Sequence, residues 1–263
     1  MVQVSAAEEA VISIRSLLPG LHWMQWSGGA SCRSGDPTIV GLGVDPERFR
    51  FQIRHYAREN AEGPLTLWEW LDRAPALALF NAGQYYPDYS YMGLLVLDGR
   101  PVRSILHHIF QGIFAAEPVG DRSPRAMILD LAWDAFDPRR TGYREVAQSF
   151  MLLDRFGSIR VQRTQNVANR TVMAEDHEGG IWIFVTQGGY TLWELGQLLQ
   201  SSPFPILQAM SMDGGEEAQM VVRVGGFLYD SMGSWDPKEG TGRPGPRSRR
   251  PLPTVIGVLA RDQ

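Results

Sequence analysis

Three stretches of this chain have the pattern of β-hairpins, and they constrain the fold more than any other feature of the sequence. Each stretch pairs two apolar or alternating runs across a short turn that contains glycine, which is typical of two antiparallel strands. The stretches are 92–102, which turns at Asp98-Gly99, 170–186, which turns near 177–180, and 219–229, which turns at a pair of glycines. The sequence therefore predicts a protein built largely from antiparallel sheets.

Further apolar runs predict additional strands, and two short segments predict helices. The strands are expected at 38–44, 48–56, 76–80, 126–132, 205–212 and 254–260. The segments 66–73 and 191–200 each begin with a threonine followed three residues later by a glutamate, which is the capping box that starts a helix. Many hairpin strands and a few helices predict an α+β fold with mixed, largely antiparallel sheets.

Two other segments are also predicted to be helical, and the first of them sets the expected domain limits. Residues 1–20 read as a short helical lead-in, with a Gly/Ser-rich loop after it, so we expect 1–37 to be a lead-in and loop. Residues 38–263 are expected to form one domain, with a long Gly/Pro/Arg-rich loop at 233–253. Within this domain, apolar residues recur at helical spacing over 143–156, which predicts an amphipathic helix.

Composition excludes several classes of protein. A net charge of −4 gives no electrostatic reason to expect a nucleic-acid partner. The single cysteine, Cys32, excludes a disulfide within the chain, and its Gly/Ser-rich surroundings favour a plain loop residue over a nucleophile. No run approaches the ~20 apolar residues of a membrane span, and the N-terminal residues lack the pattern of an export signal.

Common catalytic and metal-binding motifs are missing from the sequence. There is no G-x-S-x-G, P-loop or G-x-G-x-x-G, so neither a Ser-His-Asp hydrolase nor a nucleotide enzyme is supported. The histidines do not have the spacing of metal ligands. Asp130, Asp134 and Asp137 have the spacing of one helix face, which we expect to be solvated rather than a cation site.

Asp213-Gly214-Gly215 is the first candidate for chemistry. It follows the apolar run 205–212, and two further carboxylates, Glu216 and Glu217, come directly after it. Asp-Gly is a common hairpin turn, but the gap before the next strand is longer than a tight turn needs. The residues leave two interpretations open, a turn and a carboxylate held at a strand end for chemistry.

A second polar cluster, Asn81, Gly83, Gln84 and Tyr85, lies just after the strand at 76–80. Amide and aromatic groups of this kind hold sugars in many proteins, although a packed polar loop explains them equally well. A capped helix and an apolar strand precede this cluster, as they also precede Asp213, which suggests that two similar units deliver Asn81 and Asp213 to comparable places.

Asn169-Arg170-Thr171 is the third candidate, directly before the second hairpin. The planar guanidinium of Arg170 suits a phosphate or a carboxylate. A surface salt bridge is the alternative and the usual role of a lone arginine.

Taken in order, the motifs of this chain resemble the phosphodiester glycosidase domain family. They are VDPERFRF, TLWEW, ALALFNAGQYY, GLLVLDGRPV, NRTVMAEDHEGGIWIFVT, TLWELGQLLQ, MDGGEEAQMVV and RPLPTVIGVLA, and they extend from about Ile39 to Leu259. The family includes the uncovering enzyme, which removes N-acetylglucosamine from a sugar phosphodiester, and bacterial proteins associated with exopolysaccharide. The bacterial branch is the most similar, although many members carry small residues where Glu216 and Glu217 stand here.

The resemblance implies a hydrolase that cleaves the glycosidic bond of a sugar-1-phosphodiester and releases a sugar and a phosphomonoester. It implies that Asp213 acts at the anomeric carbon as base or nucleophile, that Arg170 binds the phosphate, and that Glu217 is a reserve acid or base. The substrate-binding residues would be Asn81, Gly83, Gln84, Tyr85, Asn169, Thr171, Gly214 and Gly215.

The other expectations from the resemblance concern cofactor, location and an alternative role. No cofactor is expected, although a divalent cation held by Asp213, Glu216 and Glu217 stays open. Members of the family are commonly exported, so a periplasmic or extracellular protein is expected. The alternative function is a non-catalytic protein that binds glycan or exopolysaccharide on the same scaffold.

Overall fold

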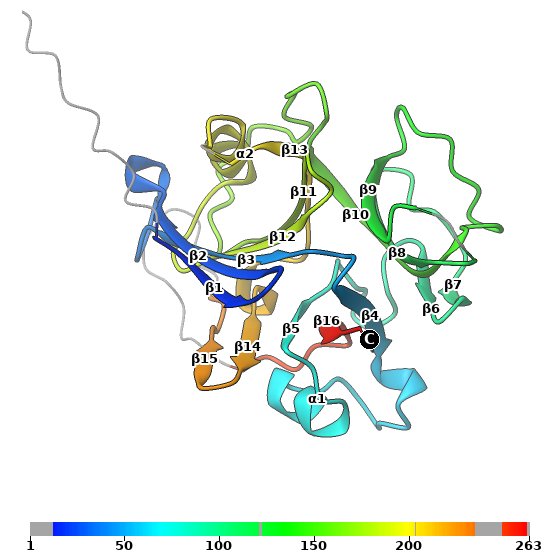
Figure 1. Cartoon of the computed structure of the whole chain (residues 1–263). Helices are drawn as coiled ribbons and strands as arrows, with labels where there is room; N and C mark the ends of the chain where they lie inside the picture. The colour runs from blue at the N-terminus through cyan, green and yellow to red at the C-terminus, as the bar shows by residue number, and fades with distance from the viewer. Residues whose placement is uncertain (1–12, 121–122, 203, 235–248, 262–263) are drawn as a thin grey trace, which may run out of the picture.

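Two antiparallel sheets carry most of the structure (Figure 1). The computed structural model describes residues 13–120, 123–202, 204–234 and 249–261. Every strand pair in both sheets is antiparallel, and two α-helices occur among the described residues. The predicted α+β protein is therefore strongly dominated by its sheets.

The larger sheet has the strand order β1-β2-β3-β12-β11-β13-β10-β6-β7, and β8 pairs with both β10 and β9 beside this path. Its strands are β1 (Ser13–Leu18), β2 (Leu21–Ser27), β3 (Thr38–Val44), β6 (Leu95–Leu97), β7 (Arg100–Arg103), β8 (Gly112–Pro118), β9 (Ala126–Asp130), β10 (Tyr143–Leu153), β11 (Thr171–Asp176), β12 (Ile181–Thr186) and β13 (Ile206–Ser211). The long strand β10 pairs with β13 toward one end and with β6 and β8 toward the other, so it joins two parts of the sheet.

The smaller sheet has the order β15-β14-β5-β16-β4. Its strands are β4 (Phe49–His55), β5 (Ala78–Asn81), β14 (Met220–Val224), β15 (Phe227–Asp230) and β16 (Thr254–Ala260). The closing strand β16 lies between β4 and β5, so the C-terminal segment is inserted between strands that come early in the chain.

The main apolar core draws on both sheets. Phe51 and Phe80 from the smaller sheet share it with Phe114, Met151 and Ile183 from the larger one, and none is more than 3% exposed. The rings of Phe51 and Phe114 meet edge to face with their centroids 5.1 Å apart. Since burying a phenylalanine side chain contributes about 2–3 kcal/mol, contacts of this kind hold the two sheets together.

The two helices predicted from capping boxes are present and begin at those boxes. In α1 (Leu67–Arg73), the hydroxyl of Thr66 accepts the Glu69 amide at 3.3 Å, while the Glu69 carboxylate accepts the Thr66 amide at 2.8 Å. In α2 (Leu192–Gln200), Thr191 and Glu194 exchange the same pair of bonds. Trp70 on the buried side of α1 donates its Nε1–H to the carbonyl of Leu252, which fixes the segment that leads into β16.

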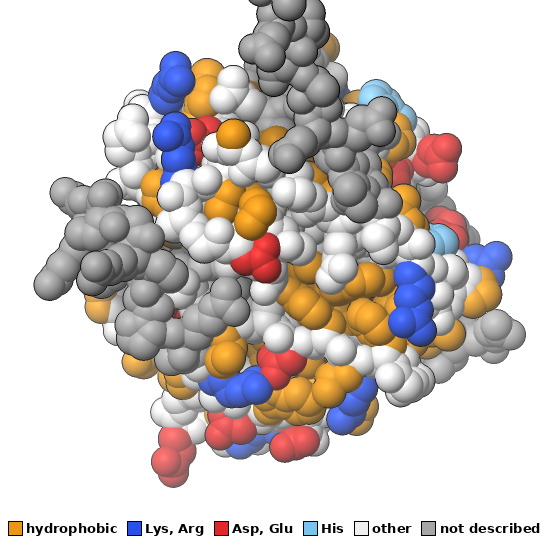
Figure 2. Space-filling view, turned by 90° about the vertical axis from the view of Figure 1, so that its left-hand side faces the viewer, with side chains coloured by type: hydrophobic (Ala, Val, Ile, Leu, Met, Phe, Trp, Pro, Cys, Tyr) orange, Lys and Arg blue, Asp and Glu red, His pale blue; other side chains and the backbone are white. Residues whose placement is uncertain are grey.

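The three predicted hairpins are confirmed as β6–β7, β11–β12 and β14–β15. The first turns at Asp98-Gly99, where both residues have positive φ, as a tight two-residue turn of this kind requires. Figure 2 views the face that carries β1, β2 and β15, where hydrophobic side chains lie among charged ones. Ile14 and Leu228 are among the exposed hydrophobic side chains of these strands.

The helix predicted over 143–156 is wrong, because Tyr143–Leu153 forms strand β10. Polar residues at 145, 148 and 149 gave the segment its apparent solvent face, but all three side chains are buried. Gln148 accepts bonds from the amides of Leu94 and His107 and donates to the carbonyl of Phe110. These polar side chains form hydrogen bonds inside the protein and therefore do not need to face water. Their spacing along a strand that is buried on both faces happens to match that of the polar face of an amphipathic helix.

The N-terminal segment also differs from its prediction over the part that the structure describes. Residues 13–18 form β1 rather than a helix, and β1 pairs with β2 across a turn at Gly20. Strand β2 pairs in turn with all of β3. The predicted helix over 1–12 and most of the predicted loop, at 235–248, lie outside the described residues. None of the helices in the described ranges has the length and apolar character needed to cross a membrane.

Candidate active site

The three sequence motifs lie at strand ends that meet where the two sheets join. Asn81 ends β5 of the smaller sheet, Arg170 precedes β11, and Asp213 follows β13 of the larger sheet. The Nδ2 of Asn81 donates to the backbone carbonyl of Asp213 at 2.9 Å, and its Oδ1 accepts from the hydroxyl of Thr171 at 2.7 Å. One buried amide therefore links all three motifs.

Asp213 presents a carboxyl group that is only partly exposed. Its Oδ1 accepts the backbone N–H of Gly214 at 2.9 Å, and its own backbone N–H donates to the carbonyl of Ala82 at 3.1 Å. Burial, reinforced by the negative charge of Glu217, raises the pKa of Asp213 to about 7, although the Gly214 N–H and two arginines, Arg170 and Arg250, act in the opposite direction. Near neutral pH this carboxyl can therefore gain or lose a proton.

Glu217 lies beside Asp213 in a different environment. It belongs to a 3₁₀ turn, η3 (Gly215–Glu217). Its Oε1 accepts the hydroxyl of Tyr85 at 2.9 Å and forms an ion pair with Arg250, whose Nε lies 3.1 Å away. Burial, followed by the charge of Glu217, raises the pKa of Tyr85, so the phenol remains a neutral donor. The two neighbouring carboxyl groups thus differ, because Glu217 is held by a phenol and a guanidinium and Asp213 by a single amide.

Arg170 approaches Asp213 from the segment directly before β11, and most of its guanidinium is already bonded. Its Nε donates to the carbonyl of Tyr190 at 3.0 Å and its Nη2 to the carbonyl of Asn166 at 2.6 Å. No hydrogen bond from its Nη1 to a described residue is present. Burial lowers the pKa of Arg170 to about 10 against the opposing charge of Asp213, so the group stays protonated at neutral pH.

The glycines of the motifs make room for protein atoms. A Cβ on Gly214 would lie 3.2 Å from Nη1 of Arg170 and 3.0 Å from the Asn169 carbonyl. A Cβ on Gly83 would lie 2.4 Å from the hydroxyl of Tyr91, which accepts the Gly83 amide. Gly215 has a φ of +75° and donates its amide to the carbonyl of Asn169. These glycines therefore allow the motif backbones to pack closely.

Three of the predicted amide side chains form hydrogen bonds within the protein through both their nitrogen and their oxygen. Asn81 is bonded as described above. Gln84 donates to the carbonyl of Met212 and accepts from Ser149. Asn169 donates to the carbonyl of Thr186 and accepts from the backbone and hydroxyl of Ser234. The amides therefore form the frame of the site, and the predicted residues left to meet a ligand are Asp213, Glu217, Tyr85 and Arg170 through its Nη1.

Arg250 is the residue that the sequence motifs missed. It lies in the segment before β16, and its Nη1 is 3.2 Å from Oε2 of Glu216 in addition to its bond with Glu217. The available signal was the complementary charge of two adjacent acids, Glu216-Glu217, and two adjacent arginines, Arg249-Arg250. The separation in sequence hid the pairing, because nothing local brings these residues together.

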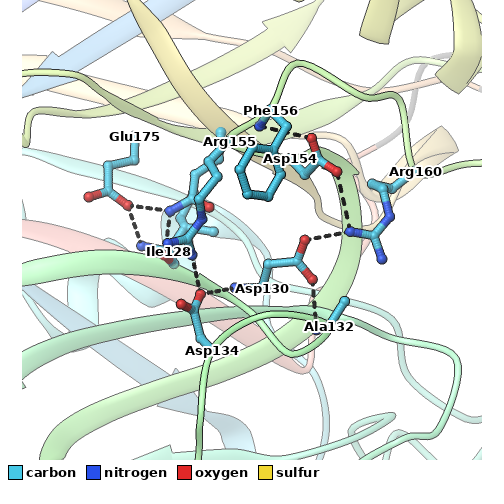
Figure 3. Close-up of polar contacts among 10 residues, drawn as sticks. Ile128, Asp130, Ala132, Asp134, Asp154, Arg155, Phe156, Arg160 and Glu175 are labelled. Carbon is cyan, nitrogen blue, oxygen red and sulfur yellow. Dashed lines mark hydrogen bonds and ion pairs between the residues drawn. The ribbon is translucent and has the colours of Figure 1, made fainter.

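Asp130 and Asp134 do not lie on a solvated helix face as predicted (Figure 3), whereas Asp137 is exposed. Asp130 ends β9, is fully buried and pairs with Arg160 at 2.5 Å. Asp134 accepts the amide of Asp130 and pairs with Arg155. The carboxylates of Asp130 and Asp134 are neutralised by arginines, so this cluster is a structural ion-pair network.

No group of three or more His, Cys, Asp or Glu side chains is arranged to hold a metal ion in the described part of the chain. A cleft of about 520 Å³ lies apart from the motif residues, lined among others by His22, Arg125, Asp176 and Trp182. The Asp176 carboxylate in that cleft is already bonded to Gly180 and to Trp182 within its own hairpin. Burial raises the pKa of two carboxyl groups to about 7, that of Asp213 among the motif residues and that of Glu145 in the core. Glu145 accepts the amides of Ile53 and Asp98 at its two oxygens, so Asp213 is the one that we assign to the site.

Three solved structures share this fold at low sequence identity. The catalytic domain of zebrafish N-acetylglucosamine-1-phosphodiester alpha-N-acetylglucosaminidase has a TM-score of 0.60 and 16% identity over 98% of this chain and 85% of that chain. A hypothetical protein from Synechocystis has a TM-score of 0.62 and 12% identity over 97% of this chain and 64% of that chain. A protein from Burkholderia pseudomallei K96243 described as exported has a TM-score of 0.59 and 10% identity over 96% and 97% of the two chains.

The family assignment comes from the sequence itself. A search of curated proteins found no significant match. The profile of the phosphodiester glycosidase family matches residues 76–259, a range that includes Asn81, Arg170, Asp213, Glu217 and Arg250. Because this match spans well over half of the chain, the chain belongs to the phosphodiester glycosidase family.

Proposed function

We propose that this protein is a hydrolase that cleaves the glycosidic bond of a sugar-1-phosphodiester and releases the sugar and a phosphomonoester. The observation that carries the proposal is the meeting of two unlike carboxyl groups, Asp213 and Glu217, with the guanidinium of Arg170 at the joined strand ends. Membership in the phosphodiester glycosidase family supports the same reaction.

In the proposed reaction Asp213 acts as the general base. Its ionised form takes a proton from a water molecule whose oxygen bonds to the anomeric carbon, while the bond from that carbon to the phosphate oxygen breaks. A base works best when its pKa lies near the working pH, and the pKa of Asp213 is about 7. Phosphate is a good leaving group and departs without needing a proton.

Arg170 and Glu217 support this step in different ways. Nη1 of Arg170, next to Gly214, would bind a phosphate oxygen and stabilise the charge that develops as the bond breaks. The carboxylate of Glu217 would stabilise the positive charge at the anomeric carbon in an oxocarbenium-like transition state and stays the reserve acid or base. Asn81 and Thr171 would orient the substrate through the frame that they form.

The substrate and location are proposed from the comparisons. The zebrafish neighbour is named for an N-acetylglucosamine phosphodiester, so N-acetylglucosamine is the first sugar to test. One neighbour is described as exported, which supports action on carbohydrate outside the cytoplasm, for example on exopolysaccharide. We propose that the reaction needs no cofactor, because the site supplies a base and a phosphate ligand from its own side chains.

The test uses N-acetylglucosamine joined through its C1 phosphate to 4-nitrophenol. Cleavage at C1 releases 4-nitrophenyl phosphate, which alkaline phosphatase converts to coloured 4-nitrophenol, and ³¹P NMR identifies the monoester directly. We expect turnover, read by ³¹P NMR because a chelator would inactivate the coupling phosphatase, that survives treatment with a chelator. Binding of the diester without turnover would instead favour the non-catalytic glycan-binding function, and loss of turnover on chelation would favour a cation held by Asp213, Glu216 and Glu217.

A further inference from the structure

Arg250 is held at the edge of the candidate site by the two acids that follow Asp-Gly-Gly. Its Nη1 donates to Oε2 of Glu216 at 3.2 Å, and its Nε forms an ion pair with Oε1 of Glu217 at 3.1 Å. The backbone is fixed as well, because the buried Gln219 donates its Nε2 both to the carbonyl of Arg250 at 3.0 Å and to that of Glu216 at 2.8 Å. The guanidinium therefore has a defined position beside Asp213.

This arginine remains available to a ligand. Its side chain is 47% exposed, whereas that of Glu217 is 17% exposed. Arg170, by contrast, spends its Nε and Nη2 on backbone carbonyls and is largely covered. Of the two guanidinium groups that act on Asp213, Arg250 is thus the more exposed to solvent, so it can meet the outer part of a bulky leaving group while Arg170 meets a phosphate oxygen inside the site.

The formal charges around Asp213 suit an anionic substrate better when Arg250 is counted. Arg170 and Arg250 together balance Glu216 and Glu217, so the ionised carboxylate of Asp213, the proposed base, is the one charge of these five groups that stays unbalanced. Without Arg250, the two glutamates would outnumber the remaining arginine and repel a phosphodiester, which carries one negative charge. The glutamates that depart from the common family pattern are accompanied here by the arginine that balances them.

We propose that Arg250, oriented by Glu216 and Glu217, binds the phosphate of the substrate and makes the site select leaving groups that carry a phosphate. This inference rests on the proposed hydrolysis of a sugar phosphodiester and names the residue that recognises its leaving group. Glu216 is then a positioning residue, since it acts through Arg250. The planar donor fork of arginine suits phosphate better than a lysine ammonium does.

The experiment measures binding of the two reaction products separately by titration calorimetry, with 4-nitrophenyl phosphate and free N-acetylglucosamine as probes. Replacing Arg250 by Gln should weaken phosphate-ester binding about 10- to 100-fold, the usual effect of losing a charged hydrogen bond. Binding of the free sugar should stay within about twofold. Arg250→Lys should fall between wild type and Gln. Glu216→Asp keeps the charge but shortens the side chain that orients Arg250, and should weaken phosphate binding about threefold.

Arg249 provides the matched control. It pairs with Asp230 at 2.6 Å and lies over the ring of Trp68, away from the two glutamates. Arg249→Gln should leave both affinities unchanged, and the melting temperature of every variant shows whether it is folded. Equal weakening by Arg249→Gln and Arg250→Gln, or parallel loss of sugar and phosphate binding, would overturn the proposal.

The outcome is separable from that of the proposed function. If wild type binds the phosphate ester through Arg250 but turns over no diester, the hydrolase function fails and the phosphate contact stands. If wild type hydrolyses the diester and Arg250→Gln leaves kcat/KM and product binding unchanged, the hydrolase function stands and this inference fails.

Discussion

Two clusters of acids and arginines in this protein look alike in composition and differ in how their charges are balanced. Around Asp130, each of the two main carboxylates has its own arginine and a backbone amide (Figure 3). Around Asp213, the carboxyl group accepts one amide bond and lies close to another carboxylate, Glu217. Complete pairing is typical of a structural network, whereas incomplete pairing leaves a group that can exchange a proton.

The comparison predicts its largest effect at Asp213. Asp213→Asn should lower kcat/KM for the phosphodiester about 100-fold or more, the contribution expected of a general base. The same change should raise the melting temperature at pH 8. Burial raises the folded pKa of Asp213 above its unfolded value, so ionisation of this group costs stability as the pH rises from about 4 to 7.

Both parts are checked by the coupled phosphatase assay and by thermal melts of wild type and variant. Retention of full hydrolysis by Asp213→Asn would show that the carboxyl is not the base. A fall in melting temperature at pH 8 would contradict the idea that the site stores an unfavourable charge.

The second prediction concerns the paired cluster, where the same substitution should act on stability. Asp130→Asn leaves Arg160 without its closest partner in a buried position, and should lower the free energy of unfolding by about 2–3 kcal/mol. The value is placed below that of a fully buried pair because Arg160 is 24% exposed. Urea denaturation measures this loss, and kcat/KM of the folded variant should stay within about twofold. An Asp130→Asn variant with the same free energy of unfolding as the wild type would show that the Asp130 cluster is not a stabilising ion-pair network, and the proposed difference between the two clusters would be wrong.

The third prediction is a pH profile. The base form of Asp213 is populated above its pKa, so kcat/KM should rise about tenfold per pH unit below about 7 and level off above it. A series of initial rates between pH 5 and 9 tests this at constant ionic strength. A profile that instead declines through pH 7 would indicate that the protonated carboxyl is the active form and that Asp213 serves as the acid.

The smallest effect is expected at Tyr85. Tyr85→Phe removes the hydrogen bond to Glu217 and leaves that carboxylate to Arg250 alone, so kcat/KM should fall about 2- to 10-fold. Tyr86→Phe is the matched control, because Tyr86 contributes its ring beneath Arg103 and the substitution preserves that ring. Equal rates for the two variants would separate Tyr85 from the site.

The sequence predicted the parts of this fold that depend on neighbouring residues. The three hairpins and both capping boxes are set by local turn and cap chemistry, and all five are present. Strand β10 was not predictable in this way, because Gln148 and Ser149 donate hydrogen bonds to backbone carbonyls that are distant in the sequence. A pattern of side chains cannot tell a polar group that meets water from one that meets buried backbone.

The candidate site divides along the same line. The motif residues Asn81, Arg170 and Asp213 could be named from the sequence, and the structure brings them to one place. Which of them form the frame could not be read from the sequence, because the answer lies in their partners on other strands. Arg250 was hidden for the same reason, since only the folded chain places it against Glu216 and Glu217.

Asn81 gives this arrangement a consequence for how the protein can diverge. Its buried amide holds β5 of one sheet to the motifs before β11 and after β13 of the other. A substitution of Asn81 or of its partner Thr171 would disturb both the packing of the two sheets and the position of Asp213, so we expect few such substitutions to be tolerated. Residues 216 and 250 lie outside this joint between the two sheets, so under the proposed function a lineage could change the leaving group that the site accepts by exchanging them while Asp213, Glu217 and their frame stay as they are.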